Sequence, residues 1–176
     1  VGCPEMGTLL TMPTSGELCV DYRSYGSEYK NETAHPGYYS TELTKYGIKC
    51  EVASTLRSSI ERYTFPKGKG NLLFNLGNGL TNEVGASLRR ISDTEFEGTR
   101  LLGTFCYNPQ AVFPIYFVVR VNKKPAAYGM WKKQPAFGNA QAQWDSDQGK
   151  YKLYPGYGRD MPGNDIGYYM SVSYTH

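Results

Sequence analysis

The chain has 176 residues and a formal net charge of +3, from 19 Lys and Arg against 16 Asp and Glu. This length suits one domain with a sizeable core, no apolar run approaches the roughly 18 residues of a membrane span, and the scattered basic residues indicate no nucleic-acid partner. The 16 Tyr, 20 Gly and 10 Pro predict many short strands with half-buried aromatic faces, joined by tight turns, and few helices.

The first half of the chain contains two candidate strands of different kinds. Apolar residues alternate with polar ones from Ile48 to Arg57, which predicts a strand with one solvent-exposed face, and the pattern continues to Phe65. Pro66 and the glycines that follow it predict a turn. The short apolar run from Leu72 to Leu76 then predicts a strand that is buried on both faces.

The second half contains a candidate hairpin and a longer apolar run. Residues 87–91 and 94–99 flank Ser92-Asp93, which predicts a two-residue hairpin turn. The run from Ala111 to Val121 is the best candidate for a core strand, and we expect residues 126–131 to pair with it across a turn. No helical periodicity exceeds two turns, so the fold class expected is all-β, an antiparallel β-sandwich, with a barrel as the alternative.

The ends of the chain and its polar C-terminal third carry further expectations. The first residue is Val1, and residues 168–174 read as a strand that ends without a turn. We therefore expect a single domain over residues 1–176 that is truncated at both ends. Residues 135–167 are rich in Gly, Gln, Asn, Asp and Tyr, which predicts a long surface loop around one or two weak strands.

Cysteine number and spacing narrow the choice of chemistry. Cys3, Cys19, Cys50 and Cys106 contain no C-x-x-C pair, so no structural zinc site is indicated. Four cysteines are compatible with two disulfides in an exported protein and equally with buried free thiols. His35 and His176 have no motif partners, so no Ser-His-Asp or Cys-His catalytic set can be assembled, and His35 is better read as a turn residue before Pro36-Gly37.

A series of short motifs resembles the N-terminal β-domain of glycoside hydrolase family 92, the exo-acting α-mannosidases. The segment 2–13 (GCPEMGTLLTMP) is similar to the family's opening motif. Further landmarks follow in the family's order as far as residue 131, and no single one of them is specific. They are residues 35–40 (HPGYYS), 46–51 (YGIKCE), 62–66 (RYTFP), 75–79 (NLGNG), 116–119 (YFVV) and 128–129 (YG).

The resemblance implies a two-lobed parent enzyme, in which this β-domain packs against a C-terminal helical catalytic lobe that is absent from the chain. Family members invert the anomeric centre and use calcium, and the acid, the base and most calcium ligands lie in the helical lobe. The resemblance therefore implies no catalytic residue and no metal ligand in this chain, a mannose-containing glycan as the partner of the complete enzyme, and a secreted or periplasmic location. Self-association through the exposed lobe interface is a further expectation.

The resemblance also suggests which residues approach the sugar. Gly2, Cys3 and Pro4 follow directly on the family's sugar-binding loop, so they are candidates for one wall of the substrate pocket, or else a simple lead-in to a strand. The family usually has Gly-Asp where this chain has Gly7-Thr8. The missing carboxylate either changes the substrate or reflects an Asp that only caps a turn in the relatives.

Two residue groups in the polar third are weaker candidates. The acidic and amide residues supply oxygens that calcium prefers, but their spacing matches no EF-hand, and a solvated loop is the simpler interpretation. The aromatic residues could stack on sugars, but half-buried packing is the simpler interpretation. These residues are Asp145, Asp147, Asp160, Asn164 and Asp165, and Trp144, Tyr151, Tyr154 and Tyr157.

The function expected is thus the N-terminal β-domain of a calcium-dependent, inverting α-mannosidase of the α-1,2 type, inactive without its catalytic lobe. The alternative is a non-catalytic carbohydrate-binding module, which would bind glycans unaided. A single-stranded nucleic-acid binder is the least favoured reading, and its binding would weaken steeply with salt.

Overall fold

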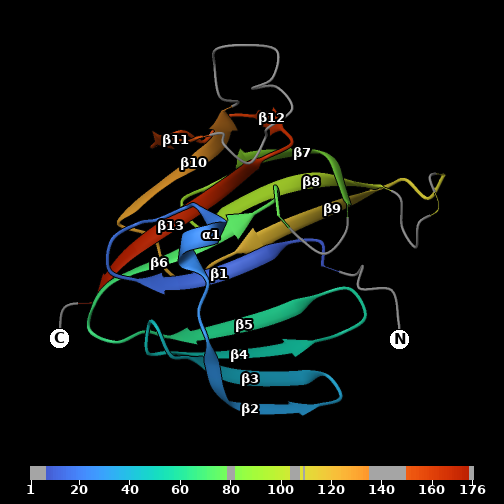
Figure 1. Ribbon diagram of the computed structural model, residues 1–176. Coiled ribbons are helices and arrows are strands. Elements are labelled where there is room, and N and C mark those ends of the chain that lie inside the picture. Colours follow the sequence, from blue (N-terminus) through green and yellow to red (C-terminus); the bar gives the residue numbers. More distant parts are fainter. Residues whose placement is uncertain (1–6, 79–81, 104–107, 109, 135–149, 175–176) are drawn as a thin grey trace. The chain divides into compact units, whose positions relative to one another are not determined.

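The computed structural model shows a chain built almost entirely of β-strands (Figure 1). It describes residues 7–78, 82–103, 108, 110–134 and 150–174. The elements in these ranges are β1 (Leu10–Ser15), α1 (Tyr22–Tyr25), β2 (Tyr29–His35), β3 (Tyr38–Leu43), β4 (Ile48–Ser54), β5 (Ser59–Thr64), β6 (Gly68–Asn75), β7 (Asn82–Arg90), β8 (Glu95–Gly103), β9 (Phe113–Arg120), β10 (Ala127–Gln134), β11 (Lys150–Pro155), β12 (Met161–Gly163) and β13 (Ile166–Tyr174).

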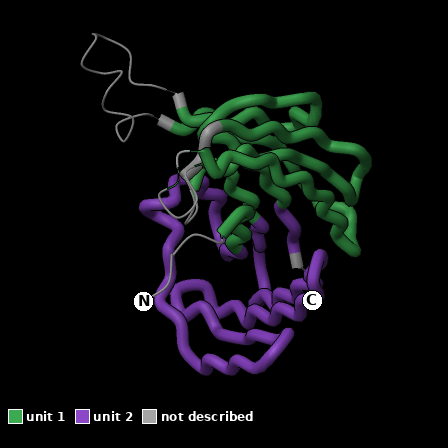
Figure 2. Tube along the Cα trace, turned by 90° about the vertical axis from the view of Figure 1, so that its right-hand side faces the viewer, with its two compact units in different colours: residues 1–12, 73–170 green, residues 13–72, 171–176 purple. Residues whose placement is uncertain are grey.

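The strands form open sheets, and the chain divides into two compact units (Figure 2). One sheet has the order β1-β6-β13-β10-β11, a second has the order β12-β7-β8-β9, and a third has the order β2-β3-β4-β5. Unit 1 comprises residues 1–12 and 73–170, and unit 2 comprises residues 13–72 and 171–176. The pairings β2–β3–β4–β5, β7–β8–β9, β12–β7 and β10–β11 are antiparallel, which confirms the fold class expected from the sequence.

The core of unit 1 is aromatic and lies between two sheets. Phe96 on β8 contacts Phe74 on β6, with the ring centroids 4.7 Å apart, and stacks on Tyr168 of β13 at 4.5 Å. All three side chains are buried, as is Trp131 on β10. Rings offset or edge-on at these distances add to the stabilisation that comes from burying their area. The antiparallel sheets therefore pack face to face as in a sandwich.

Unit 2 contains the meander β2 to β5, in which consecutive strands are neighbours (Figure 1). On β4, Ile48 and Cys50 are buried, while Lys49 between them is exposed. Over residues 48–50 this alternation agrees with the period of two in the sequence, but Glu51 is buried as well. The expected single strand to Phe65 is two strands, because β4 ends at Ser54 and β5 pairs back on it. The turn between β2 and β3 contains Gly37 with φ of +77°, a backbone conformation that a residue without Cβ adopts at no steric cost.

Two expectations about strand placement were wrong. The apolar run predicted as the best core strand, β9, lies at the edge of the β12-β7-β8-β9 sheet and exposes alternate side chains. β10 does not pair with it, because β10 belongs to the five-stranded sheet between β13 and β11. Apolar content alone does not distinguish a central strand from an edge strand, because edge strands also use β-branched and aromatic residues.

Smaller differences concern turns and the polar third. β7 and β8 form the predicted hairpin, but residues 91–94 connect them in place of a two-residue turn. β6 begins at Gly68, inside the segment predicted as a turn. In the part of 135–167 that the structure describes, β11 and β12 occur, as expected for one or two strands. Within the described ranges the helix α1 has four residues, and no helix there is long and apolar enough to cross a bilayer.

Candidate functional site

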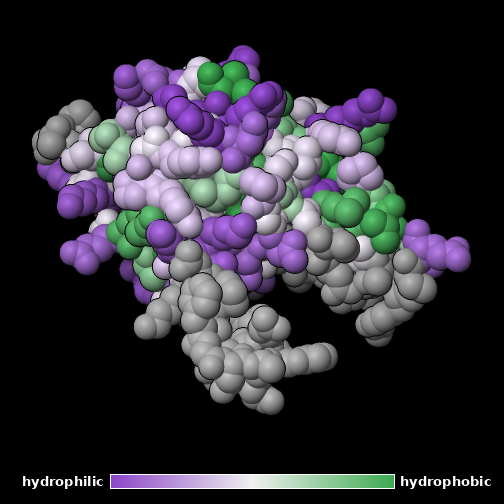
Figure 3. All heavy atoms as spheres, turned by 90° about the horizontal axis from the view of Figure 1, so that it is seen from above, coloured by the Kyte–Doolittle hydropathy of each residue, from purple (hydrophilic) through white to green (hydrophobic). Residues whose placement is uncertain are grey.

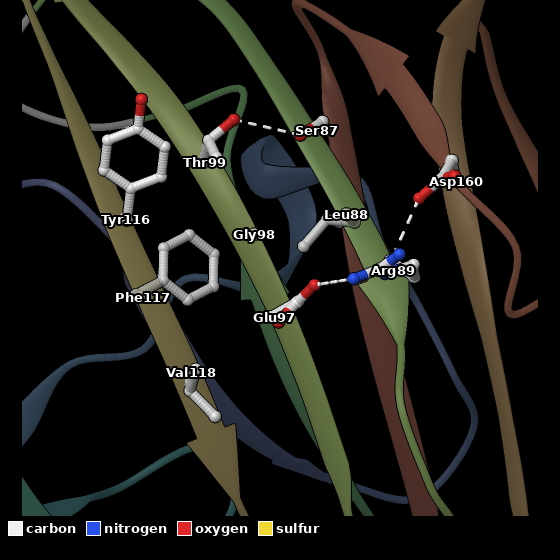
Figure 4. Close-up of a pocket in the computed structure, with 10 residues that line it drawn as sticks. All are labelled: Ser87, Leu88, Arg89, Glu97, Gly98, Thr99, Tyr116, Phe117, Val118 and Asp160. Carbon is white, nitrogen blue, oxygen red and sulfur yellow. Dashed lines mark hydrogen bonds and ion pairs between the residues drawn. The ribbon is translucent and has the colours of Figure 1, made fainter.

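A hollow of about 360 Å³ lies on unit 1 over strands β7, β8 and β9 (Figure 4). The pleat directs Phe96 and Leu88 into the core, so the odd-numbered residues of β7 and β8 point to the opposite face. The antiparallel register then places the side chains of this outer face in rows that cross the strands. We call the outer side of β7, β8 and β9 the outer face.

The first row of the outer face consists of hydroxyl groups and one aromatic ring. Ser87 lies opposite Thr99, and Thr99 lies opposite Tyr116. The Ser87 and Thr99 hydroxyl oxygens are 2.9 Å apart and share a hydrogen bond. Tyr116 on the edge strand is 74% exposed. This row therefore offers a ring and two adjacent hydroxyls to solvent (Figure 4).

The second row is a chain of charges that ends in an apolar side chain. Arg89 lies opposite Glu97, and Glu97 lies opposite Val118, which is 60% exposed. Arg89 donates from Nε to Glu97 Oε1 at 3.0 Å, and its Nε is 3.8 Å from Asp160 Oδ1. The hydrogen bond to Glu97 raises the pKa of Arg89. The guanidinium is thus held in place by carboxylates on both sides.

Two further observations concern the surface seen in Figure 3 and a second hollow. Seen from above, hydrophilic residues cover most of the visible surface, and hydrophobic residues form separate patches (Figure 3). A second hollow, in unit 2, is lined by polar groups around Thr44 and Lys45, and Lys45 Nζ donates to the Ser24 carbonyl oxygen at 2.6 Å. That hollow holds no exposed aromatic ring among its lining residues.

The most concentrated charge cluster lies in unit 2 around Glu51. Arg62 donates from Nε and from a terminal nitrogen to the two carboxylate oxygens, at 2.8 and 2.9 Å. Tyr38 donates its hydroxyl at 3.0 Å, and Lys49 Nζ lies 3.2 Å away. Arg62 is the main reason that the pKa of Glu51 is lowered to about 2. A carboxylate held in this way stays ionised and is a poor general acid.

The candidate pocket residues from the sequence, Gly2, Cys3 and Pro4, lie outside the described residues. Thr8, where the resemblance led us to expect an Asp, is described, and its main-chain oxygen accepts a hydrogen bond from the buried guanidinium of Arg100. The main chain at this position therefore helps to anchor the N-terminal segment within unit 1, whichever side chain it carries.

Four of the weaker candidates of the polar third pack against or pair with neighbouring residues. Tyr154 and Tyr157 contact each other with centroids 6.2 Å apart, and both are half-buried. Asp165 pairs with Lys133 at 3.7 Å, and Asp160 pairs with Arg89. Trp144, Asp145 and Asp147 lie outside the described residues. His35 stacks on Tyr38 beside the turn, 4.9 Å between centroids.

No group of three or more His, Cys, Asp or Glu side chains that could hold a metal ion occurs in the described ranges. Glu51, Glu97 and Asp160 are each paired with an arginine side chain. Cys19 is exposed and Cys50 is buried, and both are free thiols. Burial raises the pKa of Cys50 to about 11, so this thiol is a poor nucleophile.

Sequence reasoning missed the outer face because it assigned β9 to the core. A signal was present in the run itself: Pro114, Tyr116 and Arg120 all stand at even-numbered positions, and each is less typical of a fully buried strand than Ile115 and Val119, although Val118 interrupts the pattern. Such an alternation predicts an edge strand with one solvent-exposed side.

The comparisons with known proteins agree on one family. The model of the glycosyl hydrolase family 92 N-terminal domain matches residues 1–171. The family GH92 α-mannosidase BT3965 from Bacteroides thetaiotaomicron, solved alone and in complex with mannoimidazole, is similar with a TM-score of 0.75 and 22% identity over 97% of this chain. The GH92 family glycosyl hydrolase ccman5 is similar with a TM-score of 0.69 and 22% identity over 95% of this chain.

The chain spans 22% of the length of each of these solved proteins. At this level of identity the structural similarity supports the β-fold described above. A comparison with curated protein sequences found no match. Because the family model covers nearly the whole chain, and because the fold agrees, the chain belongs to the family of glycosyl hydrolase family 92 N-terminal domains.

Proposed function

We propose that this chain is the N-terminal β-domain of a calcium-dependent, inverting α-mannosidase that acts on α-1,2-linked mannose and is secreted or periplasmic. The single observation that carries the proposal is the family match over residues 1–171. The β-domain would form one wall of the mannose pocket through Gly2, Cys3 and Pro4, and it would brace a helical catalytic lobe.

Inversion requires a carboxylic acid for the leaving oxygen and a carboxylate about 6.5–9.5 Å away that activates water. In the part of the chain that the structure describes, the carboxyl groups with a shifted pKa are Glu51 and Asp93, and both pKa values are lowered. A general acid needs the opposite shift. Neither Glu51 nor Asp93 therefore suits the role of the acid. Following the family resemblance, we assign the acid, the base and the calcium ligands to the helical lobe, and we expect the 176-residue chain alone to be inactive.

The test compares two proteins, the 176-residue chain and the product of its complete reading frame, each with calcium and an aryl α-mannoside. We expect turnover in the longer protein alone, and loss of that turnover with EDTA. Proton NMR of the first sugar released then distinguishes inversion from retention. Turnover by the 176-residue chain would contradict the assignment of the acid and base to another lobe.

A further inference from the structure

The outer face carries features that a solvent-exposed side of a sheet does not need. Tyr116 and Val118 are 74% and 60% exposed on a strand whose charged residue, Arg120, lies at its end. Edge strands usually expose charged side chains, which discourage association with other chains. An exposed ring and an exposed isopropyl group on the same side of an edge strand therefore indicate a surface that another molecule covers.

Each of the two rows places polar side chains beside one of these two exposed residues. Ser87 and Thr99 lie beside Tyr116, and Glu97 and Arg89 lie beside Val118. Two hydroxyls that share one hydrogen bond retain a second O–H and several lone pairs for a ligand. The guanidinium of Arg89 has five N–H donors, of which Glu97 takes one on Nε and one on a terminal nitrogen.

This combination selects a class of ligand. A purely apolar ligand would leave the hydroxyls and the charged row without partners. An anion would meet Glu97 and Asp160, which together outnumber the one guanidinium between them. A neutral pyranose fits both rows, because it has a face of C–H groups that can cover a ring and a rim of hydroxyls that donate and accept.

We propose that the outer face of β7, β8 and β9 (Figure 4) is a glycan-binding surface. One sugar ring would cover Tyr116, and its hydroxyls would bond to Thr99, Ser87 and Glu97. The hollow of about 360 Å³ is large enough for a sugar residue and open enough for a chain to continue across the sheet. The surface would hold a neutral oligosaccharide in place without cleaving it.

The class of ligand rests on the outer face alone, whereas the choice of mannose as the sugar rests on the proposed function. The two can fail separately. Binding by the 176-residue chain needs no catalytic lobe, so an inactive longer protein would refute the mannosidase proposal and leave this one standing. If the longer protein is active but its isolated β-domain binds no glycan, the mannosidase proposal stands and the glycan-binding proposal is refuted.

The experiment titrates the ¹⁵N-labelled 176-residue chain with an α-linked mannotetraose and measures the dissociation constant from chemical-shift changes. We expect the changes to centre on β8 and β9, and Tyr116→Ala to weaken binding by about tenfold or more, as for loss of an aromatic anchor. Tyr116→Phe should retain most of the affinity, because the ring remains. Thr99→Val, which removes only the hydroxyl, should weaken binding to a smaller extent.

Tyr29→Ala is the matched control, because Tyr29 is also an exposed tyrosine, 58% exposed, but lies on β2 of unit 2. Its dissociation constant should equal that of the unmodified chain. Absence of binding to mannotetraose and to soluble xylan and glucan oligosaccharides would overturn the proposal. So would binding that Tyr116→Ala leaves unchanged, or protection of Tyr116 by the rest of the longer protein in solvent-accessibility labelling.

Discussion

Individual charged residues of this domain are explained by their partners, and Glu51 is the clearest case. Arg62, Tyr38 and Lys49 converge on its carboxylate from neighbouring positions of β3, β4 and β5. The alternation of charged and apolar residues along β4 can be read in the sequence. That three partners meet at the carboxylate of Glu51 depends on the register of β3, β4 and β5. The cluster is a structural one, because every partner neutralises or hydrogen-bonds the carboxylate.

The Glu51 cluster makes stability depend on pH in a defined direction. The pKa of Glu51 is lowered from 4.5 to about 2 in the folded chain, so its contribution is complete above 4.5 and is lost as the pH falls toward 2. Glu51→Gln should reduce stability at neutral pH and flatten the pH dependence between these values. Urea unfolding midpoints at about pH 3 and about pH 7 measure both effects.

Glu42→Gln is the control for this prediction. Glu42 lies on the neighbouring strand β3 and pairs with Lys30 at 3.2 Å, but its side chain is more exposed than that of Glu51. Exposed ion pairs contribute little to stability, so this variant should keep the acid dependence of the unmodified chain. An equal response of the two variants would show that Glu51 has no special role.

The two described cysteines should differ in reactivity. Cys19 is exposed, whereas Cys50 is buried on β4 with its pKa raised to about 11. Because the thiolate is the reactive form, iodoacetamide should label Cys19 in the native chain and should reach Cys50 only after unfolding. Peptide mass spectrometry with and without urea measures this, and rapid native labelling of Cys50 would contradict its burial.

Strands and their close contacts explain several of the motifs that carry the family resemblance. Gly129 lies where an added Cβ would be 2.6 Å from the main-chain oxygen of Tyr154 on the paired strand β11. A Cβ on Gly77 would overlap Asp165. Gly129 is therefore required by packing between strands and Gly77 by packing between two connecting segments, so the presence of these motif glycines alone does not indicate a ligand site.

Gly167 on β13 provides the sharpest test of such packing. An added Cβ there would overlap the indole ring of the fully buried Trp131, which has no room to move aside. We expect Gly167→Ala to lower the free energy of unfolding by about 1–3 kcal/mol, as overpacking of a core does. Gly26→Ala, where nothing lies within 4 Å and φ is −53°, should change it little.

At the scale of the whole molecule, the described residues supply β-structure and surface, and our proposal takes the catalytic groups from elsewhere in the protein. No group of three or more His, Cys, Asp or Glu that could hold a metal ion occurs in the described ranges, and Glu97 and Asp160 are paired with Arg89. This division explains how a chain that spans 22% of its structural relatives can fold around a core of its own and still be expected to lack activity.

Calcium removal should affect the longer protein and the 176-residue chain differently. We expect EDTA to abolish turnover by the longer protein and to leave the thermal midpoint of the 176-residue chain unchanged, because a ligand stabilises only a protein that binds it. Differential scanning fluorimetry with millimolar calcium or EDTA measures the second effect. A midpoint that rises with calcium in the 176-residue chain would place a binding site in this domain.

The sequence by itself determined the class of fold and the family. Alternation at a period of two, frequent Gly and Pro and the absence of long helical patterns are local properties, and they predicted an antiparallel β-fold, the strand β4 and the β7–β8 hairpin. The motifs in register also identified the family, which the match over residues 1–171 confirmed. The pocket residues Gly2, Cys3 and Pro4 stay a prediction.

Only the tertiary structure decided which strands are neighbours and therefore which side chains meet. β9 was predicted for the core, because its apolar run resembles a buried strand, but its place at a sheet edge exposes Tyr116 and Val118. β10 was expected to pair with β9, its neighbour in the sequence, but it belongs to the five-stranded sheet. Strand order depends on long-range pairing, which local residue patterns do not encode, and the rows of the outer face and the partners of Glu51 both follow from that pairing.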